Sequence, residues 1–159
     1  MPPTGGIMVS ISAFGTRRAA RISGLALFPM LLTAAAPPPT VEVSVTGLRS
    51  TKGQVLVCLT TNRKAFPDCS KDAGSVRMAV KAADAGNFAV HAPAAGTYAI
   101  AVVHDENGNN KLDKAIFLPK EGFGFSRNPT ITVGPPSFKS ASFAVSGDMR
   151  QSIKMKYML

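Results

Sequence analysis

The side chains best suited to chemistry lie in one stretch of the 159-residue chain, residues 104–113, which is rich in Asp and Asn. Alternating oxygen atoms on a tightly curled backbone suit Ca²⁺, which takes six to eight oxygen ligands. Four such side chains recur at odd offsets: Asp105, Asn107, Asn109 and Asp113. The helix–loop–helix calcium motif would require Gly at Asn110 and Glu at Ile116, so the match is incomplete. The alternative is a turn whose Asn and Asp side chains hydrogen-bond to their own backbone.

The chain from Asp105 to Asn128 is a 24-residue connection with little strand character, and a second candidate region lies in its later half, where Gly alternates with Phe. Connections of this length in a compact domain are usually functional or disordered, and the Phe and Gly content argues against disorder. Its aromatic and charged side chains form a predicted binding surface: His104, Lys120, Glu121, Phe123, Phe125, Arg127 and Asn128. The alternative places Phe123 and Phe125 beneath the loop, where they would plug one end of the domain.

Residues with the chemistry of catalysis are few. The chain has two histidines, His91 and His104. A hydrolytic arrangement would combine His104 with Asp105 and Ser126, but Ser126 lacks the nucleophile-elbow signature. A metal site on the two histidines would require them to meet, which neighbouring strands permit but do not require. The sequence therefore favours a protein without enzymatic activity.

Short strands are the elements that must position these loops, because apolar side chains alternate with a period of two along most of the chain. The clearest runs are 41–45, 55–59, 76–80, 88–92, 98–102, 143–145 and 153–157, with a weaker run at 130–133. The nearest approach to a helical pattern is a single turn near 62–66. Seven or eight short strands predict an all-β fold, a single antiparallel β-sandwich.

The first 36 residues have the pattern of a cleavable secretory signal peptide. Residues 1–21 contain Arg17, Arg18 and Arg21 without acidic side chains, and the uncharged run 22–36 ends in three alanines. A membrane-spanning helix needs about 20 apolar residues, so this run is too short for a permanent anchor. We expect cleavage after Ala35 or Ala36, which leaves residues 37–159 as one domain in the periplasm or outside the cell.

Export changes the interpretation of the two cysteines, Cys58 and Cys69. In an oxidising compartment a small, even number of cysteines favours a disulfide. In the chain-entropy model a bridge across about 10 intervening residues contributes roughly 2–3 kcal/mol. A metal or redox pair is the minor alternative, because the spacing is not Cys-x-x-Cys.

The charge balance excludes one class of partner. Removing the three signal arginines lowers the net charge from +9 to +6, with 15 basic and 9 acidic side chains remaining. The remaining basic residues are scattered singly, without the cluster that marks a nucleic-acid interface. The excess positive charge either serves solubility or attracts anionic envelope polymers and lipid head groups.

Residues 53–57, 66–68 and 96–109, with 119–126 and 134–138, together resemble the bacterial family known as domain of unknown function 2141. The resemblance covers essentially the whole predicted domain and implies an exported Ig-like or transthyretin-like β-sandwich, without supplying an activity. The family pattern has Gly where Asn110 stands, which weakens the calcium hypothesis. Residues 87–103 are also similar to sandwich modules of carboxypeptidases and surface adhesins, which act as scaffolds or binders.

These observations predict an exported, non-catalytic module that binds an unknown envelope component or protein through the 104–128 loop. A second hypothesis is a structural or stress protein in which Ca²⁺ orders that loop. A third is a hydrolase that uses His104, Asp105 and Ser126.

Overall fold

The structure is a computed structural model that describes residues 37–111, 114–115 and 118–159. The predicted signal peptide, residues 1–36, and the predicted metal ligand Asp113 lie outside the described residues. Among the helices that are described, none is long and apolar enough to cross a membrane.

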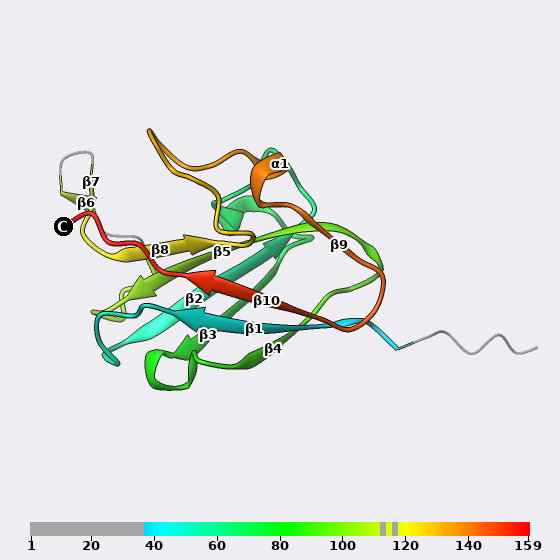
Figure 1. Ribbon diagram of the computed structural model, residues 1–159, viewed down its shortest axis with the longest axis horizontal. Coiled ribbons are helices and arrows are strands. Elements are labelled where there is room, and N and C mark those ends of the chain that lie inside the picture. The colour runs from blue at the N-terminus through cyan, green and yellow to red at the C-terminus, as the bar shows by residue number, and fades with distance from the viewer. Residues whose placement is uncertain (1–36, 112–113, 116–117) are drawn as a thin grey trace, which may run out of the picture. The chain divides into compact units, whose positions relative to one another are not determined.

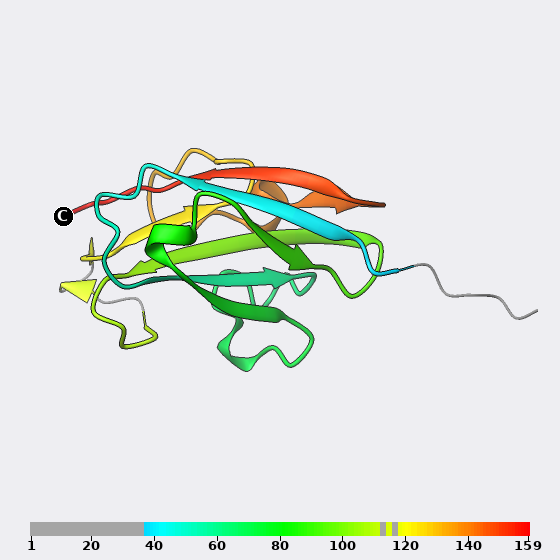
Figure 2. The same cartoon turned by 90° about the horizontal axis from the view of Figure 1, so that it is seen from below.

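Two facing β-sheets make up the fold (Figures 1 and 2). The smaller sheet has the order β10-β1-β4, formed by Met149–Lys154, Thr40–Thr46 and Phe88–His91. The larger sheet has the order β3-β2-β5-β8, formed by Val76–Lys81, Gln54–Thr60, Gly96–Asp105 and Gly122–Phe125, and β9 (Phe143–Val145) pairs with the start of β5. A separate two-stranded ladder joins β6 (Lys114–Ala115) to β7 (Leu118–Pro119). The prediction of an all-β sandwich is confirmed.

Helical structure in the described residues is confined to three short pieces. They are η1 (Cys69–Lys71), η2 (Ala82–Asp84) and α1 (Phe138–Ala141). The segment near 62–66 forms a turn, in which the N–H groups of Ala65 and Phe66 donate to the carbonyl of Asn62.

One strand pair departs from the predicted antiparallel arrangement. Strands β1 and β10 run parallel, with Val41 beside Met149 and Val45 beside Ile153. Alternation of side chains specifies which face of a strand is buried but carries no information on strand direction. The other strand pairs of the described residues are antiparallel.

The main core lies between the two sheets. Leu59 of β2, Ile100 of β5 and Ile153 of β10 are the largest apolar side chains that are completely buried there. Strand β1 contributes every second residue, Val41, Val43 and Val45, as the alternation predicts. Except in β8 (Gly122–Phe125), the period-two pattern therefore identifies the inward face correctly in both sheets.

Strand β8 lies within the connection 105–128, for which the sequence predicted little strand character. Its Gly-Phe-Gly-Phe sequence does alternate, but glycine takes the inward positions. A Cβ atom on Gly124 would lie 2.7 Å from Cγ2 of Ile153, and one on Gly122 would collide with the ring of Tyr157. A larger residue at either position would force the opposite layer to shift, because this layer approaches the β8 backbone so closely.

The two phenylalanines of β8 face the other way, onto a second, smaller core on the outer face of the larger sheet. Phe123 and Phe125 are each 6% exposed. The second core comprises Ala99, Ala101, Phe123, Phe125, Phe138 and Ala141, with Phe66 and Ile131 packed against it. The loop 61–75 and helix α1 supply the cover for this face, since they carry Phe66 and Phe138.

The prediction of a weak strand at 130–133 is wrong. This segment lies in irregular structure, and Val133 at its end is 94% exposed. Pro129 before it and Pro135 and Pro136 after it lack the N–H group that a ladder needs, which explains why pairing does not extend here.

Candidate functional site

Asp105, the last residue of β5, organises the loop that follows it. Its Oδ1 accepts hydrogen bonds from the N–H groups of Gly108 at 2.7 Å and Asn109 at 3.1 Å. Its Oδ2 accepts from the N–H of Asn110 at 2.7 Å and from Nε2 of Gln54 at 2.9 Å. Burial alone raises the pKa of Asp105, but these hydrogen bonds outweigh it and hold the pKa below its usual value. The carboxylate therefore fixes the loop 106–111 to the end of the sheet.

The next two predicted metal ligands also bond to the loop backbone. Oδ1 of Asn107 accepts from the N–H of Asn109 at 3.0 Å, and Oδ1 of Asn109 accepts from the N–H of Lys111 at 2.8 Å. Both contacts have the spacing of Asx turns, in which a side chain mimics a backbone turn. The turn predicted as the alternative is thus present. Calcium binding stays a prediction, since Asp113 lies outside the described residues.

His104 lies one residue earlier on β5 and is completely buried. Its Nε2 lies 2.9 Å from the carbonyl oxygen of Lys52, which can only accept, so Nε2 donates. Its Nδ1 lies 2.7 Å from the hydroxyl of Tyr157, and that oxygen also accepts the N–H of Arg49 at 3.1 Å. In the neutral imidazole protonated on Nε2, Nδ1 can only accept, so the phenol donates to it. His104 therefore ties the loop before β2 to the segment after β10.

Arg49 joins Glu106 to Tyr157. We call the hydrogen-bonded group of Arg49, His104, Asp105, Glu106 and Tyr157 the polar cluster. Its guanidinium lies 4.6 Å from the centre of the Tyr157 ring, and its Nε donates to Oε2 of Glu106 at 3.0 Å. Ser50 donates to the other oxygen of Glu106 at 2.8 Å. Chiefly through the hydrogen bond from Arg49, the pKa of Glu106 lies below its usual value. Arg49 also donates to main-chain oxygen atoms of Lys120 and Leu159, so one side chain connects three segments.

The structure does not bring together the three residues of the hydrolase hypothesis. Ser126 is completely buried, donates to the carbonyl of Ala141 at 2.6 Å and accepts from the N–H of Ile100 at 2.9 Å. Ile100 precedes His104 by four positions on β5, which corresponds to about 13 Å along a strand. His104 and Asp105 are adjacent in sequence but bond to different partners.

The predicted binding surface needs a correction. His104, Glu121, Phe123 and Phe125 are buried, so they do not form an exposed recognition face. The loop 61–75 and α1 cover Phe123 and Phe125, which lie on β8, a strand that the sequence pattern did not indicate. Lys120, Arg127 and Asn128 are exposed, as predicted.

The sequence pattern did not indicate three residues that bond to His104, Asp105 and Glu106. They are Arg49, Gln54 and Tyr157. They come from the first loop, from β2 and from the C-terminal segment, and no local pattern connects them. Backbone bonds between Phe123 and Lys156, at 3.0 and 2.8 Å, place Tyr157 beside β8. The Gly-Phe-Gly-Phe pattern was the available signal, because glycine in a strand often marks the close approach of another group.

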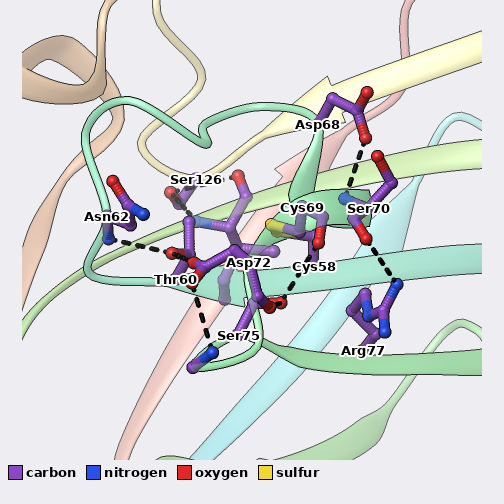
Figure 3. Close-up of a disulfide and its surroundings, with 12 residues drawn as sticks. Cys58, Thr60, Asn62, Asp68, Cys69, Ser70, Asp72, Ser75, Arg77 and Ser126 are labelled. Atoms are coloured by element: carbon purple, nitrogen blue, oxygen red, sulfur yellow. Dashed lines mark hydrogen bonds between the residues drawn. A yellow bond between two sulfur atoms is a disulfide. The ribbon is translucent and has the colours of Figure 1, made fainter.

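Cys58 of β2 and Cys69 of η1 form a disulfide, with Cα atoms 6.1 Å apart (Figure 3). Hydrogen bonds around the disulfide hold the loop 61–75, which contains Cys69. Thr60 donates to Asp72 at 2.6 Å, and this bond is the main reason that the pKa of Asp72 lies below its usual value. Arg77 of β3 donates to the carbonyl of Ser70 at 3.4 Å. The disulfide and these contacts anchor the loop that carries Phe66.

The lowered pKa values of Asp72, Asp105 and Glu106 predict a loss of stability in acid. A carboxylate whose pKa is lower in the folded state stabilises it fully above the unfolded pKa, and this contribution disappears as the pH falls through the folded pKa. Because unfolded values are about 3.9 for Asp and 4.3 for Glu, urea midpoints should be constant above about pH 6 and fall below about pH 5. Glu106→Gln should show a smaller decline than the wild type. Equal midpoints at about pH 6 and pH 3 would contradict this expectation.

The fold and the site define a class of protein: a β-sandwich with a disulfide-anchored loop over one face and a hydrogen-bonded polar cluster at one end. The family described as an uncharacterized protein conserved in bacteria (DUF2141) matches residues 43–154, and the chain belongs to this family. No curated protein and no solved structure matches the chain.

Proposed function

We propose that this protein is an exported, non-catalytic binding module of the bacterial cell envelope, and that the loop 106–111 contacts its partner. The observation that carries the proposal is the contrast within this loop. Asp105 at its base is completely buried and bonded to three loop N–H groups, whereas residues 107–111 are exposed. A loop fixed in this way loses little conformational entropy when it binds.

The surroundings of the loop support the same proposal. Glu106 is held by Arg49 and Ser50, so the first residue of the loop is fixed as well. Lys111 and Lys120 are exposed and add positive charge to the polar amide groups of the loop. This composition suits a polar or acidic surface on an envelope protein.

The disulfide supports export, because such bonds persist in oxidising compartments and are rare in the reducing cytosol. When the full chain is expressed in its native host, osmotic shock should release it with a mass that lacks the first 35 or 36 residues. A product that stays in the cytosol with an intact N-terminus would contradict export.

Site-specific photo-crosslinking tests the partner surface. A photoreactive phenylalanine at Lys111 should give a discrete adduct with an envelope protein in living cells. The same group at Lys64, an exposed lysine of the loop 61–75, is the matched control and should give none. No adduct from either position, or the same adduct from both, would contradict a role for the loop 106–111.

A further inference from the structure

A groove lies away from the loop 106–111, between the end of β8 and α1. Its volume is about 610 Å³. Its lining residues are all polar or proline: Arg127, Asn128, Pro129, Thr130, Ser137, Lys139 and Ser140. Figure 1 shows the chain looping away from the sandwich after β8 and returning through α1 to β9. The groove is therefore open to solvent and lined by groups that can form hydrogen bonds.

The charged residues that line this groove are all basic. Arg127 and Lys139 both line it, and the chain contains no Asp or Glu from Gly122 to Gly147. The Arg127 guanidinium donates to the carbonyl of Ser142 at 3.1 Å, and within the described part of the chain neither cation forms an ion pair. Arg49, at the polar cluster, pairs instead with Glu106. The groove thus holds two cations without carboxylate partners.

A third cation lies at the rim of the groove. The ammonium group of Lys156 donates to the carbonyl of Pro129 at 3.2 Å. Pro129 is itself a lining residue, so this contact places the charge of Lys156 next to the groove. Its remaining donors can add to the attraction for an anion.

The backbone at Arg127 and Asn128 is strained. Both residues have positive φ angles, 62° and 48°, which side chains with a Cβ rarely adopt. The Asn128 amide holds this conformation, because Oδ1 accepts from the N–H of Lys154 at 2.7 Å and Nδ2 donates to the carbonyl of Ser152 at 2.9 Å. Strain of this kind persists only where the surroundings enforce it, and it clusters at functional sites.

We infer that this groove binds a phosphate group, with Arg127 and Lys139 as its charged contacts. A phosphomonoester carries a charge of about −1.5 to −2 at neutral pH and three acceptor oxygens, so it can neutralise two cations at once. The planar guanidinium donates two parallel hydrogen bonds to such an oxyanion, and the ammonium group adds a point charge. The site does not involve the loop 106–111, so evidence against either proposal leaves the other unaffected.

Titration of the ¹⁵N-labelled protein with inorganic phosphate, at constant ionic strength adjusted with chloride, tests this inference. Amide signals of the groove residues should shift and saturate. Arg127→Gln and Lys139→Gln should each weaken the affinity about tenfold, as expected for the loss of one charge-assisted hydrogen bond. Among the described residues the Lys139 side chain forms no hydrogen bond or ion pair, so Lys139→Gln should not destabilise the fold. This variant therefore still tests the inference if Arg127→Gln unfolds.

The matched controls are Lys64→Gln and Lys81→Gln, which remove the same charge from exposed positions that do not line the groove. Both should keep the wild-type affinity. The inference is overturned if the groove signals do not saturate, or if the control variants lose as much affinity as the groove variants.

Vesicles separate two sources of the phosphate group. Co-sedimentation with phosphatidic acid in phosphatidylcholine, but not with phosphatidylcholine alone, would assign a lipid head group if it requires Arg127 and Lys139. Saturable phosphate binding without co-sedimentation would assign a soluble phosphate compound. Vesicle binding that persists in the Arg127→Gln and Lys139→Gln variants would count against the groove.

Discussion

Replacing both Cys58 and Cys69 with serine should lower the free energy of unfolding by about 2–3 kcal/mol. The two residues are 11 positions apart, and without the bridge the unfolded chain regains the conformational freedom of that loop. The effect is large for a domain of this size, since total stability is about 5–15 kcal/mol. Urea denaturation of the variant and the wild type under oxidising conditions measures the difference.

The structure predicts where the loosened variant should open first. Phe66, on the anchored loop, makes edge-to-face contacts with Phe125 and Phe138 at ring-centre distances of 5.7 and 5.9 Å. Without the disulfide, hydrogen exchange should accelerate in residues 61–75 before it does in β5. Wild-type protein treated with a reductant is the matched control and should behave like the variant. Identical urea midpoints, or two free thiols in protein purified from an oxidising compartment, would contradict the prediction.

Gly122→Ala should be at least as damaging, because its new methyl group would occupy the position of the Tyr157 ring. The ring must move, which breaks its contact with His104 and separates it from Arg49. Overpacking costs about 1–3 kcal/mol, and a buried polar group left without its partner costs a similar amount. We therefore expect a loss of about 3 kcal/mol in the free energy of unfolding, measured by urea denaturation.

Two comparisons separate this clash from a general effect of losing glycine. Gly86→Ala is the matched control, because no atom lies within 4 Å of the position that its new methyl group would take, and its stability should change little. In a Tyr157→Ala background the additional cost of Gly122→Ala should largely disappear, which a double-mutant cycle detects. An unchanged cost in that background would show that Tyr157 is not the obstacle.

The polar cluster was only partly predictable from the sequence. Asp105, Asn107 and Asn109 lie in one local stretch, so their turn chemistry follows from residue type and spacing. The partners of His104 cannot be predicted from local spacing, because Lys52 and Tyr157 lie 52 and 53 positions away along the chain. A histidine beside an aspartate has the same local appearance whether it is catalytic or, as in this structure, bonded to a backbone carbonyl and a phenol.

Residue alternation was sufficient to predict the two-sheet β fold, because burying one face of each strand requires apolar side chains at every second position. Tertiary contacts were needed for the rest. Glycine has no side chain to signal burial, so the inward face of β8 became apparent only from Tyr157 and Ile153 packed against it. The loop 61–75 and α1 bury Phe123 and Phe125, whereas Arg127 and Lys139 remain exposed at the groove. Local sequence governs which face a strand buries, whereas contacts between distant segments determine which charged and aromatic groups remain accessible.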